Sequence, residues 1–384
     1  MRSCARRRSL DGRRPVPAGG RAAGAAGPAP AGRLQEVGFT RVGRNGIGAG
    51  RGSLQALGAL VGACLLAAAC TAGKEAGGGP AAEAAGVRVT EFPVGSGDGP
   101  HDVAPARDGG VWFTAQAAGY LGHLDPRSGT VTRVPLGDGA RPHGVVTAAD
   151  GTAWVTDGGR NAIVRVDART RQVRSFPLPP ERAGADLNTA TVDRDGTVWF
   201  TGQAGVYGRL DPRSGRMQVF DAPGGPGPYG ITTTPAGEVW YASLAGSHIA
   251  RIDRASGRST PVAPPTSGQG ARRIWSDSQG RLWISEWNAG QLGRFDPASN
   301  RWREWRLPGD RPMPYAVFVD DRDTVWLSDF GANRLVRFDP AGERFSTVEL
   351  PGPAANVRQL AGRPGQLLGA ASALDRLLVV PTAG

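Results

Sequence analysis

The sequence predicts an all-β fold, a seven-bladed β-propeller of four-stranded blades that runs from residue 87 to the C-terminus. Three observations predict it. A tryptophan motif recurs six times at intervals of 41 to 45 residues. A second apolar run and a further turn follow each copy. The 59 glycines and 31 prolines favour short strands with tight turns over helices. A period of this length is typical of stacked repeats.

Each repeat unit reads as four short strands joined by hairpins. The recurring tryptophans follow turns such as RDGG, ADGT and RDGT, and they are Trp112, Trp154, Trp199, Trp240, Trp283 and Trp326. The next run is YLGHLD, AIVRVD, VYGRLD, HIARID, QLGRFD or RLVRFD, and an alternating run such as QVRSFPL (172–178) closes the unit. One such sheet cannot bury both of its faces. We therefore expect radially stacked sheets with the tryptophans packed between neighbouring blades.

The seventh unit is degraded, because it offers three strands (357–362, 366–372 and 376–381) and lacks the tryptophan. A matching fourth strand lies at the other end of the repeat region, in Val87–Val94 (VRVTEFPV). Pairing this N-terminal strand with the last blade would close the ring and remove two exposed sheet edges. The sequence thus predicts that 87–94 completes the seventh blade.

The N-terminal part predicts export. Residues 1–53 are read as a basic segment that is disordered or untranslated, and residues 54–70 as a signal segment. Its apolar run follows Arg44 and Arg51 and ends at Cys70 in a sequence that resembles a bacterial lipobox. Residues 71–86 are read as a flexible tether. We expect a lipoprotein attached through Cys70 to the outer face of a membrane. The alternatives are a secreted protein with a cleaved signal and an uncleaved anchor.

The distribution of charge argues against nucleic acid as a partner. The chain has a net charge of +11, but +9 of it falls in residues 1–70, so the remainder carries only +2. A nearly neutral propeller with scattered arginines has no electrostatic footprint for DNA or RNA. We expect a monomer whose partner is a small molecule or peptide at one end of the central channel.

The repeat resembles the virginiamycin B (streptogramin B) lyase family. The matching pieces are Arg141-Pro142-His143-Gly144-Val145, Asp195-Gly196-Thr197-Val198-Trp199-Phe200-Thr201 and Gly293-Arg294-Phe295-Asp296. The resemblance covers residues 87–380. It implies a lyase that opens a cyclic depsipeptide ester by elimination. It also implies Mg²⁺ held by histidines and glutamates at one end of the channel. Such chemistry needs a base for a carbon-bound proton and an electrophile for the developing enolate.

Equivalent positions of the blades place polar residues around one end of the channel. The start of the innermost strand gives His101, His143, Asn188, Tyr229, Arg272, Tyr315 and Val357. Fourteen residues later come Ala115, Asp157, Gly202, Ser243, Glu286, Asp329 and Ala371. Polar groups that converge on one concave point predict a ligand site.

From these two sets we assign expected roles. His143 is the candidate general base and His101 a second acid, base or orienting group. Asp157, Glu286 and Asp329 are the candidate ligands for Mg²⁺. Tyr229, Arg272, Tyr315 and Asn188 are the candidate substrate-binding residues. His123 and His248 lie in or before third strands, and we expect them on the outer surface.

The match to the lyases departs at the site itself. Those enzymes keep their histidines in the last two blades, with a glutamate two residues before the second one. This chain has Tyr315 and Val357 there, and Arg141 stands two residues before His143. A non-catalytic lipoprotein that binds a ligand or protein is therefore the alternative, with a lactonase-like hydrolase using a calcium cage as a third reading. Convergence of His101, His143 and Asp157 would favour the enzyme. Pairing of Arg141 with Asp157 would favour binding.

Overall fold

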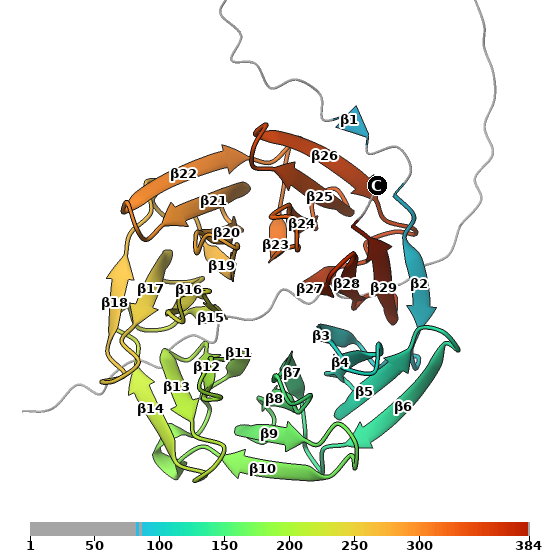
Figure 1. Cartoon of the computed structure of the whole chain (residues 1–384), viewed down its shortest axis with the longest axis vertical. Coiled ribbons are helices and arrows are strands. Elements are labelled where there is room, and N and C mark those ends of the chain that lie inside the picture. The colour runs from blue at the N-terminus through green and yellow to red at the C-terminus, as the bar shows by residue number, and fades with distance from the viewer. Residues whose placement is uncertain (1–81, 84–86, 383–384) are drawn as a thin grey trace, which may run out of the picture. The chain divides into compact units, whose positions relative to one another are not determined.

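The computed structural model describes residues 82–83 and 87–382, and within them it shows seven four-stranded sheets arranged around a central axis (Figure 1). Residues Lys74–Gly384 form a compact unit of their own. In the described part of the chain, no helix is long and apolar enough to cross a membrane. The predicted seven-bladed propeller is thus confirmed. The segments 1–53 and 54–70, with Cys70, lie outside the described residues.

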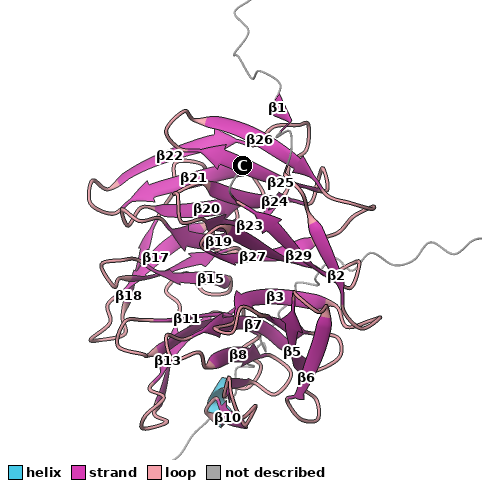
Figure 2. Cartoon of the chain, turned by 45° about the vertical axis from the view of Figure 1, so that its right-hand side comes forward, coloured by secondary structure: helices cyan, strands magenta, loops and turns pink. Residues whose placement is uncertain are grey.

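Each blade is a meander in which the first strand lies nearest the axis and the fourth lies outermost (Figures 1 and 2). Blade 1 contains β3 Pro100–Pro105, β4 Val111–Ala115, β5 Tyr120–Asp125 and β6 Thr130–Pro135. Blade 2 contains β7 Pro142–Thr147, β8 Ala153–Asp157, β9 Ala162–Val166 and β10 Val173–Pro177. Blade 3 follows the 3₁₀ turn Pro180–Arg182 and contains β11 Leu187–Val192, β12 Val198–Gly202, β13 Val206–Leu210 and β14 Met217–Asp221. Blade 4 contains β15 Pro228–Thr233, β16 Val239–Ser243, β17 His248–Ile252 and β18 Ser259–Val262.

The remaining blades keep the same order. Blade 5 contains β19 Ala271–Ser276, β20 Leu282–Glu286, β21 Gln291–Asp296 and β22 Arg301–Arg306. Blade 6 contains β23 Pro314–Val319, β24 Val325–Asp329, β25 Arg334–Asp339 and β26 Arg344–Glu349, and the two-residue β1 Ala82–Glu83 pairs in parallel with β26. Blade 7 contains β27 Val357–Arg363, β28 Gln366–Ala371 and β29 Arg376–Pro381.

The N-terminal strand β2 Thr90–Pro93 closes the ring. It pairs antiparallel with β29 from Thr90↔Val379 to Pro93↔Arg376, and it forms the outer edge of blade 7 (Figure 1). Phe92 and Val94 pack against the cluster shared by blades 7 and 1. The predicted closure by the segment 87–94 is confirmed, with the strand itself shorter than that segment.

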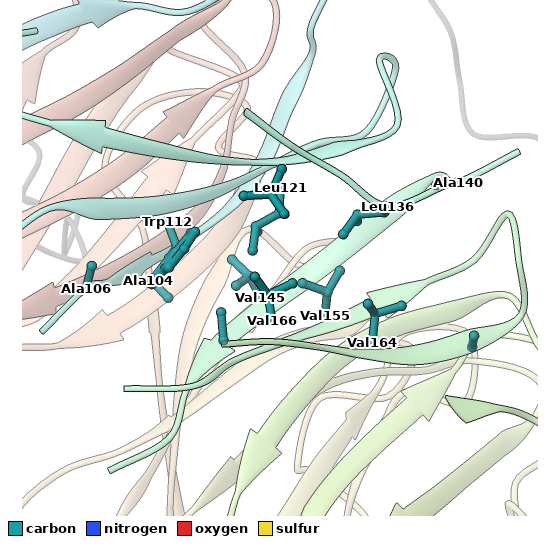
Figure 3. Packing of buried hydrophobic residues seen from close by; sticks show 13 residues of the cluster. Ala104, Ala106, Trp112, Leu121, Leu136, Ala140, Val145, Val155, Val164 and Val166 are labelled. Carbon is teal, nitrogen blue, oxygen red and sulfur yellow. The ribbon is translucent and has the colours of Figure 1, made fainter. Parts of the chain in front are cut away.

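The blades are held together by apolar clusters that span each interface. Between blades 1 and 2, Trp112 and Leu121 meet Val145, Val155 and Val164 (Figure 3). The other motif tryptophans enter the equivalent clusters with the following blade. Several also have a fixed indole partner: the Nε1–H groups of Trp199, Trp283 and Trp326 donate to an aspartate six residues earlier. The tryptophans are therefore structural, as predicted.

A β-bulge interrupts the inner strand of every blade at the same place. The register shifts between the first and fourth residues of these strands, for example between Pro100 and Val103. In blades 1, 2, 3, 5 and 6 a hydroxyl on the second strand satisfies the freed amide. Thr156 Oγ1 accepts from Gly144 N at 2.8 Å and donates to the carbonyl of Asn188 in the next blade at 2.5 Å. The bulge directs two residues of each blade toward the axis.

Candidate functional site at the start of the inner strands

We define the inner ring as the second and third residues of the seven inner strands. These residues are His101 and Asp102, His143 and Gly144, Asn188 and Thr189, Tyr229 and Gly230, Arg272 and Arg273, Tyr315 and Ala316, and Arg358 and Gln359. The six residues predicted here in blades 1 to 6 all belong to it. In blade 7 the sequence alignment was wrong by one residue. The bulge lies between Val357 and Leu360, so Arg358 and not Val357 occupies the equivalent position.

One half of the inner ring is a chain of hydrogen bonds across the channel. We call it the relay, and it consists of His101, Asp102, Arg273 and Thr189. His101 Nδ1 lies 2.8 Å from Asp102 Oδ1, and Arg273 of blade 5 binds both carboxylate oxygens, at 2.7 and 3.3 Å. Arg273 also donates to Thr189 Oγ1 at 2.7 Å. This bidentate pair joins positions 171 residues apart, and all three charged or titratable groups are buried. Asp102 is therefore fully engaged by groups of the protein itself.

The rings of the two histidines lie against each other at the edge of this relay, tilted by 47°. Their ring centroids are 3.8 Å apart, and Asn188 Nδ2 donates to His143 Nε2 over 3.2 Å. Because Asp102 accepts the proton on His101 Nδ1, the unprotonated nitrogen of that ring is Nε2. Neither His101 Nε2 nor His143 Nδ1 has a hydrogen-bond partner within the described part of the chain.

The other half of the inner ring is built from arginines and aromatic rings. The Arg272 guanidinium lies 3.6 Å from the Tyr315 ring centroid and donates to Tyr229 Oη at 2.8 Å. The hydroxyls of Tyr229 and Tyr315 are 2.7 Å apart, and Arg358 donates to Tyr315 Oη at 3.4 Å. Cation–π contact with several rings holds the Arg272 cation in place.

Two partly buried aromatic residues extend this half of the site outward. Phe330 stacks on Tyr315 with 4.6 Å between centroids, and Trp287 meets the same ring edge-on at 5.6 Å. Both follow directly after the second strand of their blades, at the end of the channel where the inner strands begin. We call this end, with Arg272, Arg358, Trp287, Phe330 and Tyr315, the channel mouth.

Burial and the arginines set the ionisation of the inner ring. Burial, reinforced by Arg358, Arg273 and Arg272, lowers the pKa of His101 well below its usual range. Burial and the neighbouring His101 do the same to the pKa of His143. Burial opposes ionisation of Tyr315, but Arg272, Arg358 and Arg273 outweigh it and lower the pKa of that phenol. Both imidazoles are therefore neutral at pH 7.

The three carboxylates predicted as metal ligands do not join the histidines. Asp157 Oδ1 accepts from the backbone amides of Arg141, Gly159 and Arg160, so it shapes the turn after β8. Asp329 Oδ1 accepts from the amides of Met313 and Gly331 in the same way. In the strand register, Asp157, Glu286 and Asp329 each pair with the first residue of the inner strand of their blade, before the bulge. The side chain of Arg141 does not fill a pocket beside Asp157; its backbone amide binds the carboxylate.

Glu286 is a different case, because its buried carboxyl group has no partner for either oxygen among the described residues. Burial, with the charge of Glu304 as a smaller cause, raises the pKa of Glu286 to about 9. The carboxyl group fills the space above Gly293 on the neighbouring strand β21. At neutral pH it is protonated, which is the wrong state for a metal ligand.

The residues that do converge form a poor site for Mg²⁺. Among the described residues, the one group of His, Cys, Asp or Glu side chains close enough to share an ion is His101, Asp102 and His143. Mg²⁺ prefers six oxygen ligands. This group offers one carboxylate, already bound by Arg273, and two imidazoles. The inner ring contains three arginines and this single carboxylate, and the three guanidinium groups act on neighbouring His101, so the formal charges of the ring sum to +2 and repel a divalent cation. The donor set does not fit Mg²⁺.

Sequence reasoning missed the third residue of each inner strand. Asp102, Thr189, Arg273 and Gln359 reach the axis because of the bulge, and a regular strand would have turned them away. The doubled arginine in ARRIW was the available signal. His123 and His248 were placed wrongly at the surface: both are buried, His123 against the Trp112 ring and His248 beside the backbone carbonyl of Gly246.

Comparison with known proteins agrees with the fold and the repeat. The model of the virginiamycin B lyase family matches residues 87–379, so the chain belongs to that family. No protein of curated function is significantly similar to the chain.

Three solved structures illustrate how far the likeness extends. A streptogramin B lyase is 23% identical, with 77% of this chain and 97% of that one covered and a TM-score of 0.70. A catalytically inactive virginiamycin B lyase from Staphylococcus aureus with quinupristin is 22% identical, with 77% and 99% covered and a TM-score of 0.71. YCF48 bound to D1 peptide is 18% identical, with 79% and 97% covered and a TM-score of 0.62. At these identities the likeness shows the shared propeller fold, and function has to be argued from the site.

Proposed function

We propose that this protein is an extracytoplasmic binding propeller, attached through Cys70, whose channel mouth recognises an anionic ligand that carries a flat apolar group. The observation that carries the proposal is the charge of the inner ring. Its residues include three arginines and one carboxylate: Arg273 binds Asp102, Arg272 is held by aromatic residues, and the neutral histidines add no charge. An anion is the species that this arrangement stabilises.

The aromatic residues supply the second half of the recognition. Trp287 and Phe330 are partly exposed at the channel mouth, and both contact the Tyr315 ring that Arg272 covers. Fixed aromatic surfaces beside a few oriented polar groups are typical of small-molecule sites. Because the guanidinium of Arg272 is held by Tyr229, Tyr315 and Trp287, the side chain loses little conformational freedom when a ligand binds.

The test uses residues 74–384, the compact unit, with naphthalene-2-sulfonate as an aromatic anion in a calorimetric titration. Arg272→Met, which keeps the length of the side chain and removes its charge, should weaken binding at least about tenfold, the size expected for one charge-assisted contact. The matched control is Arg301→Met, which changes an exposed arginine on the outer strand of the same blade. Equal affinities of the two variants would contradict the proposal.

A second candidate function, metal-independent elimination, is favoured by one observation: the His101–Asp102 pair leaves His101 Nε2 as an unprotonated nitrogen without a partner among the described residues. Nε2 would take the proton from the carbon next to the carbonyl, Arg272 would stabilise the developing enolate, and the ester C–O bond would then break and release a carboxylate. The test is opening of a streptogramin B ring in the presence of a chelator. Opening that is lost in His101→Ala would establish this function. An unopened ring would leave binding as the function.

A further inference from the structure

The axial channel contains a cavity on the far side of the relay from the channel mouth. It has a volume of about 290 Å³, and its walls come from the inner strands of all seven blades. The lining begins at the third residues Thr189, Arg273 and Gln359 and continues along the strands, for example through Ile231 and Ile274. The second residues of these strands, which form the mouth, do not line it. The relay therefore separates two spaces in one channel.

The walls combine apolar side chains with backbone donors. Val103, Val145, Ala190, Ile231, Ile274 and Leu360 line the cavity. The inner strand of each blade is the edge of its sheet nearest the axis (Figure 1). The N–H and C=O groups that it does not pair within the sheet therefore face the channel. One such amide, Val103 N, is satisfied by Gln359 Oε1 at 2.8 Å. A ligand here meets an apolar wall that still offers hydrogen-bond donors.

The floor of the cavity has one sign of charge. Among the described residues that line it, Arg273 is the one charged side chain, and its partner Asp102 lies outside the lining. Arg273 is almost fully buried, and its Nε–H has no hydrogen-bond partner among the residues that the structure describes, although its two terminal nitrogens bind Asp102 and Thr189. A buried donor without a partner is costly, and an oxygen acceptor on a ligand removes that cost.

We propose that this cavity is a second binding site, which takes a short-chain monocarboxylate with its carboxylate at the Arg273 floor and its alkyl chain along the channel wall. The inference does not depend on the function proposed for the mouth. It rests on the apolar wall and on the donor and positive charge of Arg273 at the floor. An alkylammonium ion of the same length meets that charge with the wrong sign.

The test is a calorimetric titration of residues 74–384 with acetate, butyrate and hexanoate. Because each added methylene is buried against the wall, the affinity should rise about fourfold per CH₂ up to hexanoate. Hexylammonium should bind at least about tenfold more weakly than hexanoate. Ala316→Leu, which adds volume to the lining, should weaken hexanoate at least about tenfold, with Ala190→Val as a smaller change of the same kind. Thermal unfolding of each variant checks that it is folded.

Arg272→Met separates this site from the mouth. It should leave the hexanoate affinity within about twofold, because Arg272 does not line the cavity. Hexanoate binding without any naphthalene-2-sulfonate binding would support the cavity and overturn the proposal for the mouth. The cavity proposal is overturned by an affinity that does not depend on chain length. It is equally overturned if Arg272→Met abolishes hexanoate binding while both cavity-filling variants retain it.

Discussion

At the scale of single residues, Asp102 determines what the inner ring can bind. Its carboxylate accepts from His101 and from both terminal nitrogens of Arg273, so its lone pairs are directed at groups of the protein. A buried carboxylate in this state serves to fix an arginine and a histidine ring, and it is a weak candidate for a metal ligand. The guanidinium group of Arg272 contacts neutral aromatic residues, and its charge attracts an anion.

Glu286 gives a prediction at the same scale. Its pKa of about 9 lies above that of a carboxyl group in an unfolded chain, near 4.3, so native Glu286 keeps a proton that the unfolded chain releases. Stability from this source is present below about pH 4 and is lost as the pH rises toward 9. Glu286→Gln stays neutral at every pH. It should raise the Tm by at least about 3 °C at pH 8 and leave it nearly unchanged at pH 5, as measured by scanning calorimetry.

An equal shift of the Tm at both values of pH would show that Glu286 is ionised in the native state. The isosteric comparison is Gln291→Glu on the paired strand β21, where the side chain is half-buried and opposite Glu286. A second carboxyl group there should add to the loss of stability at pH 8 and have little effect at pH 5.

At the scale of elements, the bulge and its hydroxyl position the whole inner ring. Thr114, Thr156, Thr201, Ser285 and Ser328 each bond the inner-strand carbonyl of the next blade. In blade 4 Ala242 takes this place, and there the chains approach so closely that only Gly230 fits beside Arg273. The repeated Thr or Ser two residues after most of the motif tryptophans is therefore a link between blades.

Removing one of these links should be costly. Thr156→Val keeps the shape of the side chain but leaves Gly144 N and the carbonyl of Asn188 without their partner. Because both groups are buried, we expect a loss of about 2 kcal/mol in the free energy of unfolding, measured by urea denaturation. Thr132→Val, on the exposed strand β6, is the control and should change stability by less than about 0.5 kcal/mol. A similar small effect for Thr156→Val would contradict the role of the link.

Strand β2 gives the second prediction for an element. A chain that starts at residue 95 lacks β2, so β29 becomes an unpaired edge and Phe92 no longer covers the cluster between blades 7 and 1. We expect such a chain to lose cooperative thermal unfolding or to aggregate. Of the described residues, a chain that starts at residue 87 lacks only the two of β1 at the edge of blade 6, and its Tm should stay within about 2 °C. If both chains unfold cooperatively at the same temperature, β2 is not needed to close the ring.

The sequence predicted the strands and turns well because the pattern of each strand and turn recurs in six repeat units. It predicted the inner ring less well, since a bulge shifts the register by an amount that no local pattern records, as Val357 and Arg358 show. The pair of Asp102 and Arg273 spans blades 1 and 5, so only closure of the ring reveals it. Asp157 and Asp329 looked like site residues because their spacing matched, whereas their carboxylates serve turn amides.

At the scale of the whole molecule, the nearly neutral propeller concentrates its positive charge at the centre. Some surface arginines of the described blades pair with aspartates and glutamates, as in the pairs Arg303–Glu343 and Arg376–Glu91. The inner ring holds three arginines and one carboxylate, Asp102, which binds Arg273. This chain thus has a fold that lyases and binding propellers share, and its inner ring has the positive charge that an anion site needs.

The most direct test of this account compares Mg²⁺ with an aromatic anion on the same protein. Residues 74–384 are titrated in a calorimeter, first with magnesium chloride and then with naphthalene-2-sulfonate, at low and at moderate salt. We expect saturable binding of the sulfonate, weaker at higher salt because exposed charges are screened, and no saturable heat for Mg²⁺. Saturable Mg²⁺ binding at one site, with no binding of the sulfonate, would contradict it.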